Sequence, residues 1–361
     1  MEKNQSKTRK ADVVVISIVV AVILIAIGGL VYYLTSSDSV KTNALVQISK
    51  DNKKMAVISD AEYNYKLLNL MAQFQQAYGI TDEQTAYSFW STPIDGVAQI
   101  DYFKNFALEQ IKYEKIEYLK ALESGTKLSA QEKEELKSGF DNIEKQLKDQ
   151  GVKIDDYLIN YYGISFRIYK EMSEQSRIAS KFSTTQINSI EVTDEDIINY
   201  YDENFDRYYT VRVRHILLRT KDDNGNALSE DDIEEKRELA NSLLAAINSG
   251  EDMDTLVADH SEDPGAEDNS GYYDVTKGSS YVAEFRDWAM ASQVGDAAVV
   301  ESELGYHVMK TYRTTVFEDI ILQVKKDLQT ARYSEKLSGW LGEYDIVVYE
   351  AVYESINPLA S

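Results

Sequence analysis

The sequence contains no cysteine, and this absence removes several classes of protein at once. Disulfide scaffolds, thiol nucleophiles and cysteine-based zinc sites are excluded, and so is attachment to a lipid through an N-terminal cysteine. Proline is almost as scarce, with 3 residues in a chain of 361, and glycine numbers only 17. So few helix-breaking residues favour long helices over a loop-rich β-sandwich.

Positive charge is also in short supply, because 38 Lys and Arg face 61 Asp and Glu and give a formal net charge of −23. Binding to a phosphate backbone needs a basic surface, so the composition predicts no nucleic-acid partner. We interpret the acidic excess as a solvated surface that keeps the chain soluble, not as a cation-binding site. The length allows two or three domains.

One long hydrophobic run lies near the N-terminus, at residues 13–34. As a helix it would be about 33 Å long, enough for a bilayer core of about 30 Å. Basic residues in the preceding segment 1–12 place that segment in the cytoplasm by the positive-inside rule. A cleaved signal peptide is the alternative, but Leu34–Ser37 is a poor cleavage site. We predict a single-pass anchor in the cell membrane, with the bulk of the chain extracytoplasmic. Cleavage of the anchor stays open.

The spacing of apolar residues divides the remaining chain. Residues 35–57 are polar and are interpreted as a linker. From 58 to 207 apolar residues recur every three or four positions, which predicts helices, and Ser59 to Glu62 reads as a capping box at the first helix start. Residues 316–361 continue a helical pattern but are too short to fold alone. We expect them to pack on the 58–207 block as one mostly helical domain.

Residues 208–315 have a different pattern. Tyr209–Leu218 is rich in β-branched residues and predicts a strand. A capped helix follows from Ser229 to Gly250, and further strands are expected near Ala297 to Glu301 and Tyr306 to Thr311. The sequence therefore predicts an α+β fold, with this segment inserted between helical parts.

Six short motifs occur in this segment in the order in which parvulin-type peptidyl-prolyl isomerases carry their counterparts. One motif alone would be weak evidence, whereas six in order make a specific resemblance. They are Val213–Leu218, Ser249–Met253, His260–Pro264, Ala283–Phe285, Val294–Asp296 and Leu304–Val308. The arrangement of helical N-terminal part, inserted isomerase and C-terminal helix is similar to that of the PrsA-type foldases and the related SurA chaperones.

The resemblance implies a parvulin (FKBP-like) four-stranded antiparallel sheet with surrounding helices. It places His215 and His307 side by side at its centre with Asp263 above them, as the catalytic candidates. Rotation about an X–Pro bond meets a barrier of about 18–20 kcal/mol and breaks no covalent bond, so an enzyme only has to bind the twisted amide best. Asp263 stands where some parvulins carry cysteine, which favours a non-covalent mechanism. No cofactor and no metal are expected. The alternative for the histidines is a structural hydrogen-bonded pair.

The resemblance also supplies candidates for an apolar slot that receives the proline ring. Phe285 is the firmest, because it lies in a matched motif, and ordinary core packing is the alternative for all of them. The candidates are Phe285, Tyr281, Tyr272, Met290 and Leu304. The chain departs from the family pattern at Ser270–Val275 and Gly278–Tyr281, so the rim of the slot is expected to differ.

Three other signals are weak. Asp222 to Gly225 has its glycine too early for an EF-hand loop. The cluster of Asp259, His260, Glu262 and Asp263 lies at a helix end, where neighbouring positions seldom converge on one metal. The loop after the first strand is acidic, which argues against a requirement for phosphorylated substrates.

Two functions follow as hypotheses. In the first, the chain is an isomerase and foldase that acts on unfolded or newly exported polypeptides with X–Pro bonds, at the outer face of the membrane. In the second, the isomerase domain is degenerate and the chain is a membrane-anchored holdase. A refolding assay limited by proline isomerisation distinguishes them. The sequence leaves open the client proteins and whether the chain forms a homodimer.

Overall fold

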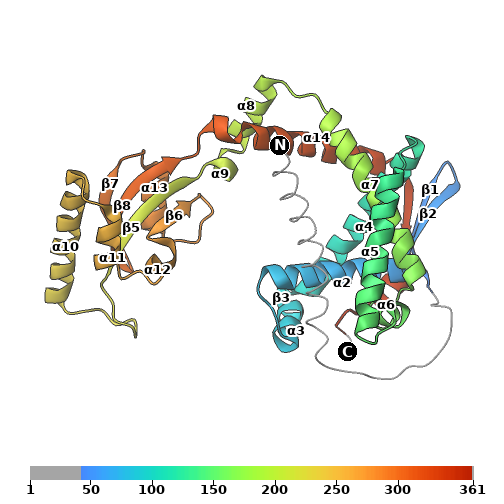
Figure 1. Ribbon diagram of the computed structural model, residues 1–361, viewed down its shortest axis with the longest axis horizontal. Coiled ribbons are helices and arrows are strands. Elements are labelled where there is room, and N and C mark those ends of the chain that lie inside the picture. Colours follow the sequence, from blue (N-terminus) through green and yellow to red (C-terminus); the bar gives the residue numbers. More distant parts are fainter. Residues whose placement is uncertain (1–41, 360–361) are drawn as a thin grey trace. The chain divides into compact units, whose positions relative to one another are not determined.

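The computed structural model describes residues 42–359, which divide into two units (Figure 1). A helical unit contains residues up to Ser189 together with those from Tyr333 onward, and a central unit contains Ile190–Arg332. The predicted segments 1–12 and 13–34 lie outside the described residues. Within residues 42–359, no helix has the length and apolar character required to cross a membrane.

The helical unit begins with a hairpin where the sequence predicts a linker, so the assignment of 35–57 as a linker is wrong for its described part. The strands of this sheet are β1 (Ala44–Lys50), β2 (Lys53–Ser59) and, from the other end of the chain, β9 (Asp345–Val348), in the order β2-β1-β9. All neighbours are antiparallel. Asp51 and Asn52 have φ of 52° and 60°, which suits a tight hairpin turn. Leu45, Val46 and Ile48 of β1 are buried, which explains why this stretch forms a strand.

Long helices make up most of this unit. Ser59 and Glu62 form the expected capping box at the start of the first helix, and Ser129 caps α5 in the same way. The elements are α2 (Asp60–Ala77), α3 (Glu83–Ser91), β3 (Pro93–Ile94), β4 (Val97–Ala98), α4 (Gln99–Glu123), α5 (Ala130–Asp149), α6 (Ile154–Tyr162), α7 (Phe166–Ser189) and α15 (Glu350–Ser355). The main core joins both ends of the chain, because Tyr344 and Tyr353 are buried with Tyr63 and Leu67 of α2.

The central unit is built on a four-stranded antiparallel sheet, as the resemblance implies. Its strand order is β6-β5-β8-β7. The elements are α8 (Asp194–Glu203), α9 (Phe205–Tyr208), β5 (Val211–Arg219), α10 (Glu230–Ser249), α11 (Met253–His260), α12 (Ala266–Asn269), β6 (Tyr272–Val275), α13 (Ala283–Ala291), β7 (Ala297–Ser302) and β8 (Gly305–Thr314). The mixed α+β fold is therefore confirmed.

Different helices pack on the two faces of this sheet. Ile216 and Leu218 of β5 pack with α10 and α11 on one face. Val211 and Val213 pack with Phe285 of α13 on the other face. Because side chains alternate along a strand, His215 belongs to the face that α13 covers.

The boundary between the units falls inside a helix, α14 (Phe317–Leu341). Val324 and Leu328 of α14 are buried with Ile197 of α8, and Arg332 forms an ion pair of 2.7 Å with Asp196. The first part of α14 therefore belongs to the central unit. The predicted boundaries at 207 and 316 assign α8 and all of α14 to the helical domain, whereas α8 and the first part of α14 belong to the central unit.

Candidate active site

The centre of the site is a pair of buried histidines on neighbouring strands. His215 lies on β5 and His307 on β8, where His307 pairs with Leu217 in the register. The two residues are thus diagonal neighbours on one face of the sheet. Their Nδ1 atoms are 3.3 Å apart, and their rings are nearly parallel at an angle of 21°. The adjacency that the resemblance implies is present.

Asp263 lies beside this pair, on the loop that follows α11. Its Oδ2 is 2.9 Å from His215 Nε2 and accepts a hydrogen bond of 2.7 Å from the Tyr273 hydroxyl. The Gly265 N–H donates to its Oδ1. Burial opposes ionisation of the carboxyl, but the hydrogen bonds from His215, Tyr273 and Gly265 outweigh it, so the pKa of Asp263 lies below its usual range. Asp263 is therefore an anion at neutral pH.

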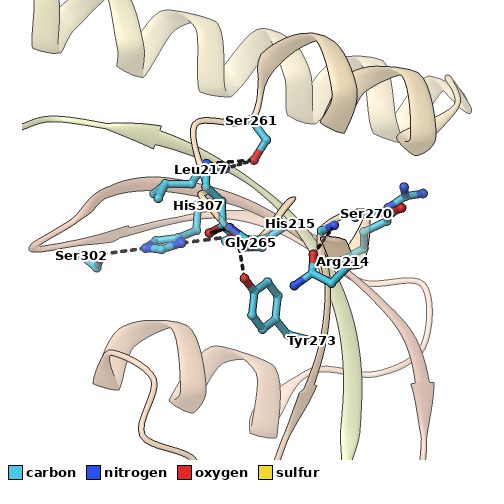
Figure 2. A network of polar contacts seen from close by, with 12 residues as sticks. Arg214, His215, Leu217, Ser261, Gly265, Ser270, Tyr273, Ser302 and His307 are labelled. Atoms are coloured by element: carbon cyan, nitrogen blue, oxygen red, sulfur yellow. Dashed lines mark hydrogen bonds and ion pairs between the residues drawn. The ribbon is translucent and has the colours of Figure 1, made fainter. Parts of the chain in front are cut away.

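Ser302 lies at the other end of this series of hydrogen-bonded side chains. Its Oγ is 2.7 Å from His307 Nε2 and accepts a hydrogen bond from the Leu304 N–H. Figure 2 shows Ser302 and Tyr273 reaching the histidine pair from different sides. Burial, and then the neighbouring His215, lower the pKa of His307 to about 4, so this imidazole is neutral at pH 7.

If each imidazole carries a single proton, the hydrogen-bond partners of His215 and His307 allow only one tautomer for each ring. The Asp263 carboxylate only accepts, so His215 Nε2–H must donate to it. His215 Nδ1 then accepts from His307 Nδ1–H, and His307 Nε2 accepts from the Ser302 hydroxyl. This assignment follows from satisfying every partner. The four side chains thus form one directed chain from Ser302 to Asp263.

Aromatic rings surround the histidines on the side that α13 covers. The ring centroid of Phe285 is 5.0 Å from that of His215 and 5.3 Å from that of His307, both edge-on. Tyr281 contacts Phe285 and Tyr273 edge-on, and Met290 packs against the same cluster. Phe285 is only 3% exposed, so it forms the floor of the site, whereas Tyr281 and Met290 are partly exposed.

Two predicted slot residues are not part of this cluster. Tyr272 lies on the opposite face of the sheet, where its ring contacts Tyr312 and the Arg214 guanidinium. The register pairs Tyr272 with Arg214 and Tyr273 with Val213, so Tyr273 takes the expected place. Leu304 lies in the turn between β7 and β8 and is 44% exposed. It contributes its N–H to Ser302.

Tyr273 and Ser302 are therefore the site residues that sequence reasoning missed. Val275, a β-branched residue two positions after Tyr273, is a signal for the correct face, since residues two apart share a face in a strand. No comparable signal identifies Ser302, because its role depends on the fold of the β7–β8 turn.

The acidic residues around His260 are not arranged to bind a metal ion. His260 lies in the last turn of α11, and Glu262 bonds to Lys236 and to the Arg219 N–H. Within residues 42–359, no group of three or more His, Cys, Asp or Glu side chains is arranged to hold a metal ion.

Comparisons with known proteins find similarity both to the central segment and to most of the chain. Residues 200–315 match the family model of the PPIC-type PPIASE domain. The foldase protein PrsA of Clostridium botulinum strain Hall is 22% identical over 350 residues, which cover 91% of this chain and 96% of that protein. PrsA of Halalkalibacterium halodurans is 26% identical over 236 residues, covering 63% of this chain and 65% of that protein. A crystal structure of the peptidylprolyl isomerase PrsA from Bacillus cereus is 22% identical, covers 73% of this chain and 94% of that one, and has a TM-score of 0.31.

The matched segment, with its histidine pair and aromatic floor, is a parvulin-type peptidyl-prolyl isomerase domain, and the chain is a rotamase enzyme. Over most of its length the chain is similar to PrsA foldases.

Proposed function

We propose that the chain is a foldase for newly exported polypeptides, held at the outer face of the cell membrane by residues 13–34. The central unit would turn over X–Pro bonds of these clients while the helical unit binds their unfolded segments. The support is the isomerase domain at residues 200–315, the foldase relatives and the apolar run at 13–34.

The mechanism proposed for the central unit is non-covalent. The chain holds no cysteine, and X–Pro rotation requires only that the twisted amide be bound better than either planar form. Tyr281 and Met290 would contact the proline ring above the Phe285 floor. The directed chain from Ser302 through His307 and His215 to Asp263 fixes the tautomers, so the polar surface does not reorganise while the amide turns.

The observation that carries this proposal is the direct contact of Phe285 with both imidazoles. It places an apolar surface beside a preorganised polar one, as a proline and its preceding carbonyl require. The test is catalysis of a proline-limited refolding reaction by the full chain. Wild-type protein should accelerate the slow phase, and His215→Ala should not. An unchanged slow phase with wild-type protein, together with suppressed aggregation, would leave only the holdase function.

The proposed membrane tether has its own test. Cell fractionation should recover the full chain in the membrane, and protease added from outside should digest the two units while residues 1–12 stay protected. Release of the whole chain by a high-salt wash would contradict an anchor at 13–34.

A further inference from the structure

The helical unit carries an open aromatic groove, separate from the isomerase site. It has a volume of about 470 Å³. Its walls come from α2, α3, α4 and the β3–β4 hairpin, and Figure 1 shows α3 and β3 beside one end of α2. We call this feature the aromatic groove. The residues that line it are Phe74, Phe89, Trp90, Ile94, Asp95, Gln99, Tyr102, Phe103 and Phe106.

The floor of the aromatic groove is a network of packed rings. Trp90 is buried, and its ring centroid is 4.8 Å from Phe103 and 4.9 Å from Phe89. Phe74 contacts Trp90 and Phe103 at 5.4 Å and 5.7 Å. Rings that interlock in this way hold the groove open without a ligand, so binding costs little rearrangement.

The rim, in contrast, leaves large apolar side chains in water. Ile94, Tyr102 and Phe106 are 49%, 48% and 49% exposed. Tyr78 and Tyr87, from the same part of the chain, are also exposed. A concentration of exposed apolar groups around a preformed groove marks an interaction site rather than ordinary surface.

The aromatic groove carries negative charge, because Asp95 is the one charged residue among the described residues that line it. Asp82 and Glu83, at the start of α3, are also exposed. Lys104 is the only Lys or Arg in residues 78–106, and it is buried with its ammonium over the Tyr353 ring at 4.8 Å. A ligand in the groove therefore meets aromatic faces and the Asp95 carboxylate. Both attract Lys and Arg side chains.

We propose that the aromatic groove binds extended client segments in which a large apolar side chain lies next to a Lys or Arg. The apolar side chain enters between Phe103, Phe106 and Ile94, and the cation lies against Tyr102 and the carboxylate of Asp95. This inference rests on the proposed foldase function and assigns the chaperone contact to one place. It also defines the client segments by their composition and does not require proline.

Binding of a labelled, proline-free peptide by fluorescence anisotropy tests the proposal, with the full chain in nanodiscs of zwitterionic lipid. The peptide carries a central Phe and Lys among Gly and Ser, and two partner peptides replace Phe by Ala or Lys by Glu. The parent peptide should bind at least tenfold more tightly than either partner. Equal binding of the Lys and Glu peptides would overturn the charge part of the proposal.

Substitutions then locate the site. The double variant Tyr102→Ala, Phe106→Ala should bind the parent peptide at least tenfold more weakly than wild type. The conservative variant Tyr102→Phe should keep most of the wild-type affinity. Tyr161→Ala is the matched control, since Tyr161 is 51% exposed on α6 of the same unit. Asp95→Asn should weaken binding of the Lys peptide and make that binding less dependent on salt. Unchanged peptide binding in the Tyr102 and Phe106 double variant would overturn the assignment.

Other occupants give distinct results. If that double variant loses self-association or vesicle binding while it keeps peptide binding, the aromatic groove serves a second copy or a lipid surface, and the proposal is wrong. All these variants should isomerise a proline tetrapeptide at the wild-type rate. A failure of the proposed function would instead appear as absent isomerase activity in the wild-type chain, independently of peptide binding.

Discussion

Tyr273 donates its hydroxyl hydrogen bond to the same Asp263 oxygen that contacts His215 Nε2. The tyrosine thus acts on the histidine pair through the carboxylate. Burial, and then the hydrogen bond to Asp263, raise the pKa of Tyr273 to about 12, so the phenol stays a donor throughout the neutral range. Its neighbour Tyr272 lies on the other face of the sheet, and the two tyrosines form a matched pair for mutagenesis.

We expect Tyr273→Phe to lower isomerase activity several-fold and to destabilise the central unit by about 1 kcal/mol, since one hydrogen bond to a partly buried carboxylate is lost. Tyr272→Phe should change neither quantity. Tetrapeptide isomerisation and urea unfolding measure both effects. Equal effects of the two substitutions would contradict the assignment of faces.

Removing either central imidazole should cost both activity and stability. His215→Ala removes one hydrogen-bond partner from Asp263 and one from His307, and His307→Ala removes one from Ser302 and one from His215. The expected loss is about 1–3 kcal/mol for each substitution, and the double variant should lose less than the sum because the residues share one chain of hydrogen bonds. His260→Ala is the control. Full activity and stability in the double variant would show that the pair has no role.

The pKa of His307, about 4, predicts how stability depends on pH. The unfolded chain protonates this imidazole near its ordinary value of about 6.5, whereas the folded chain resists protonation until about pH 4. The unfolded state therefore binds more protons between these values, and stability is complete above pH 6.5 and falls as the pH drops toward 4. The loss amounts to roughly 3 kcal/mol. Asp263, with its lowered pKa, adds a loss only at more acidic pH.

Proton NMR can test this directly, because the chain has only three histidines. The signal of His307, assigned by its absence in His307→Asn, should titrate near pH 4. The same variant should flatten the stability profile between pH 4 and 6.5. A His307 signal that titrates near 6.5 would refute the neutral, buried imidazole.

Phe285 is buried as well as central, so its substitutions must separate packing from catalysis. Phe285→Ala should destabilise the central unit by about 3–5 kcal/mol through the cavity that it leaves. Phe285→Leu keeps most of the volume, and we expect it to fold while losing much of the isomerase activity. Its suppression of client aggregation should remain at the wild-type level. Parallel loss of both activities in the Leu variant would argue against separate sites for them.

The ordered motifs allowed the central features of the site to be predicted, because each motif lies on a defined strand or loop. His215, His307 and Asp263 meet as expected. Tyr272 is the predicted slot residue, but Tyr273 lies on that face instead, because a shift of one residue reverses the face of a strand. Only the pairing with β5 fixes that register.

The sheet formed by β1, β2 and β9 was not predicted, for a different reason. Alternation along β1 is short, and its second neighbour, β9, lies about three hundred positions later in the sequence. Local patterns cannot report such a pairing. The boundary within α14 was missed for a related reason, because one continuous helical pattern serves both units.

The pairing of β1 with β9 also sets an order of events during synthesis. All four strands of the central sheet lie between Val211 and Thr314, so this unit has its whole sheet available before Asp345 leaves the ribosome. The sheet of the helical unit, in contrast, lacks its third strand until almost the entire polypeptide has emerged. On the nascent chain, the rotamase is therefore the first part that can mature, and the helical unit that surrounds it in sequence closes last.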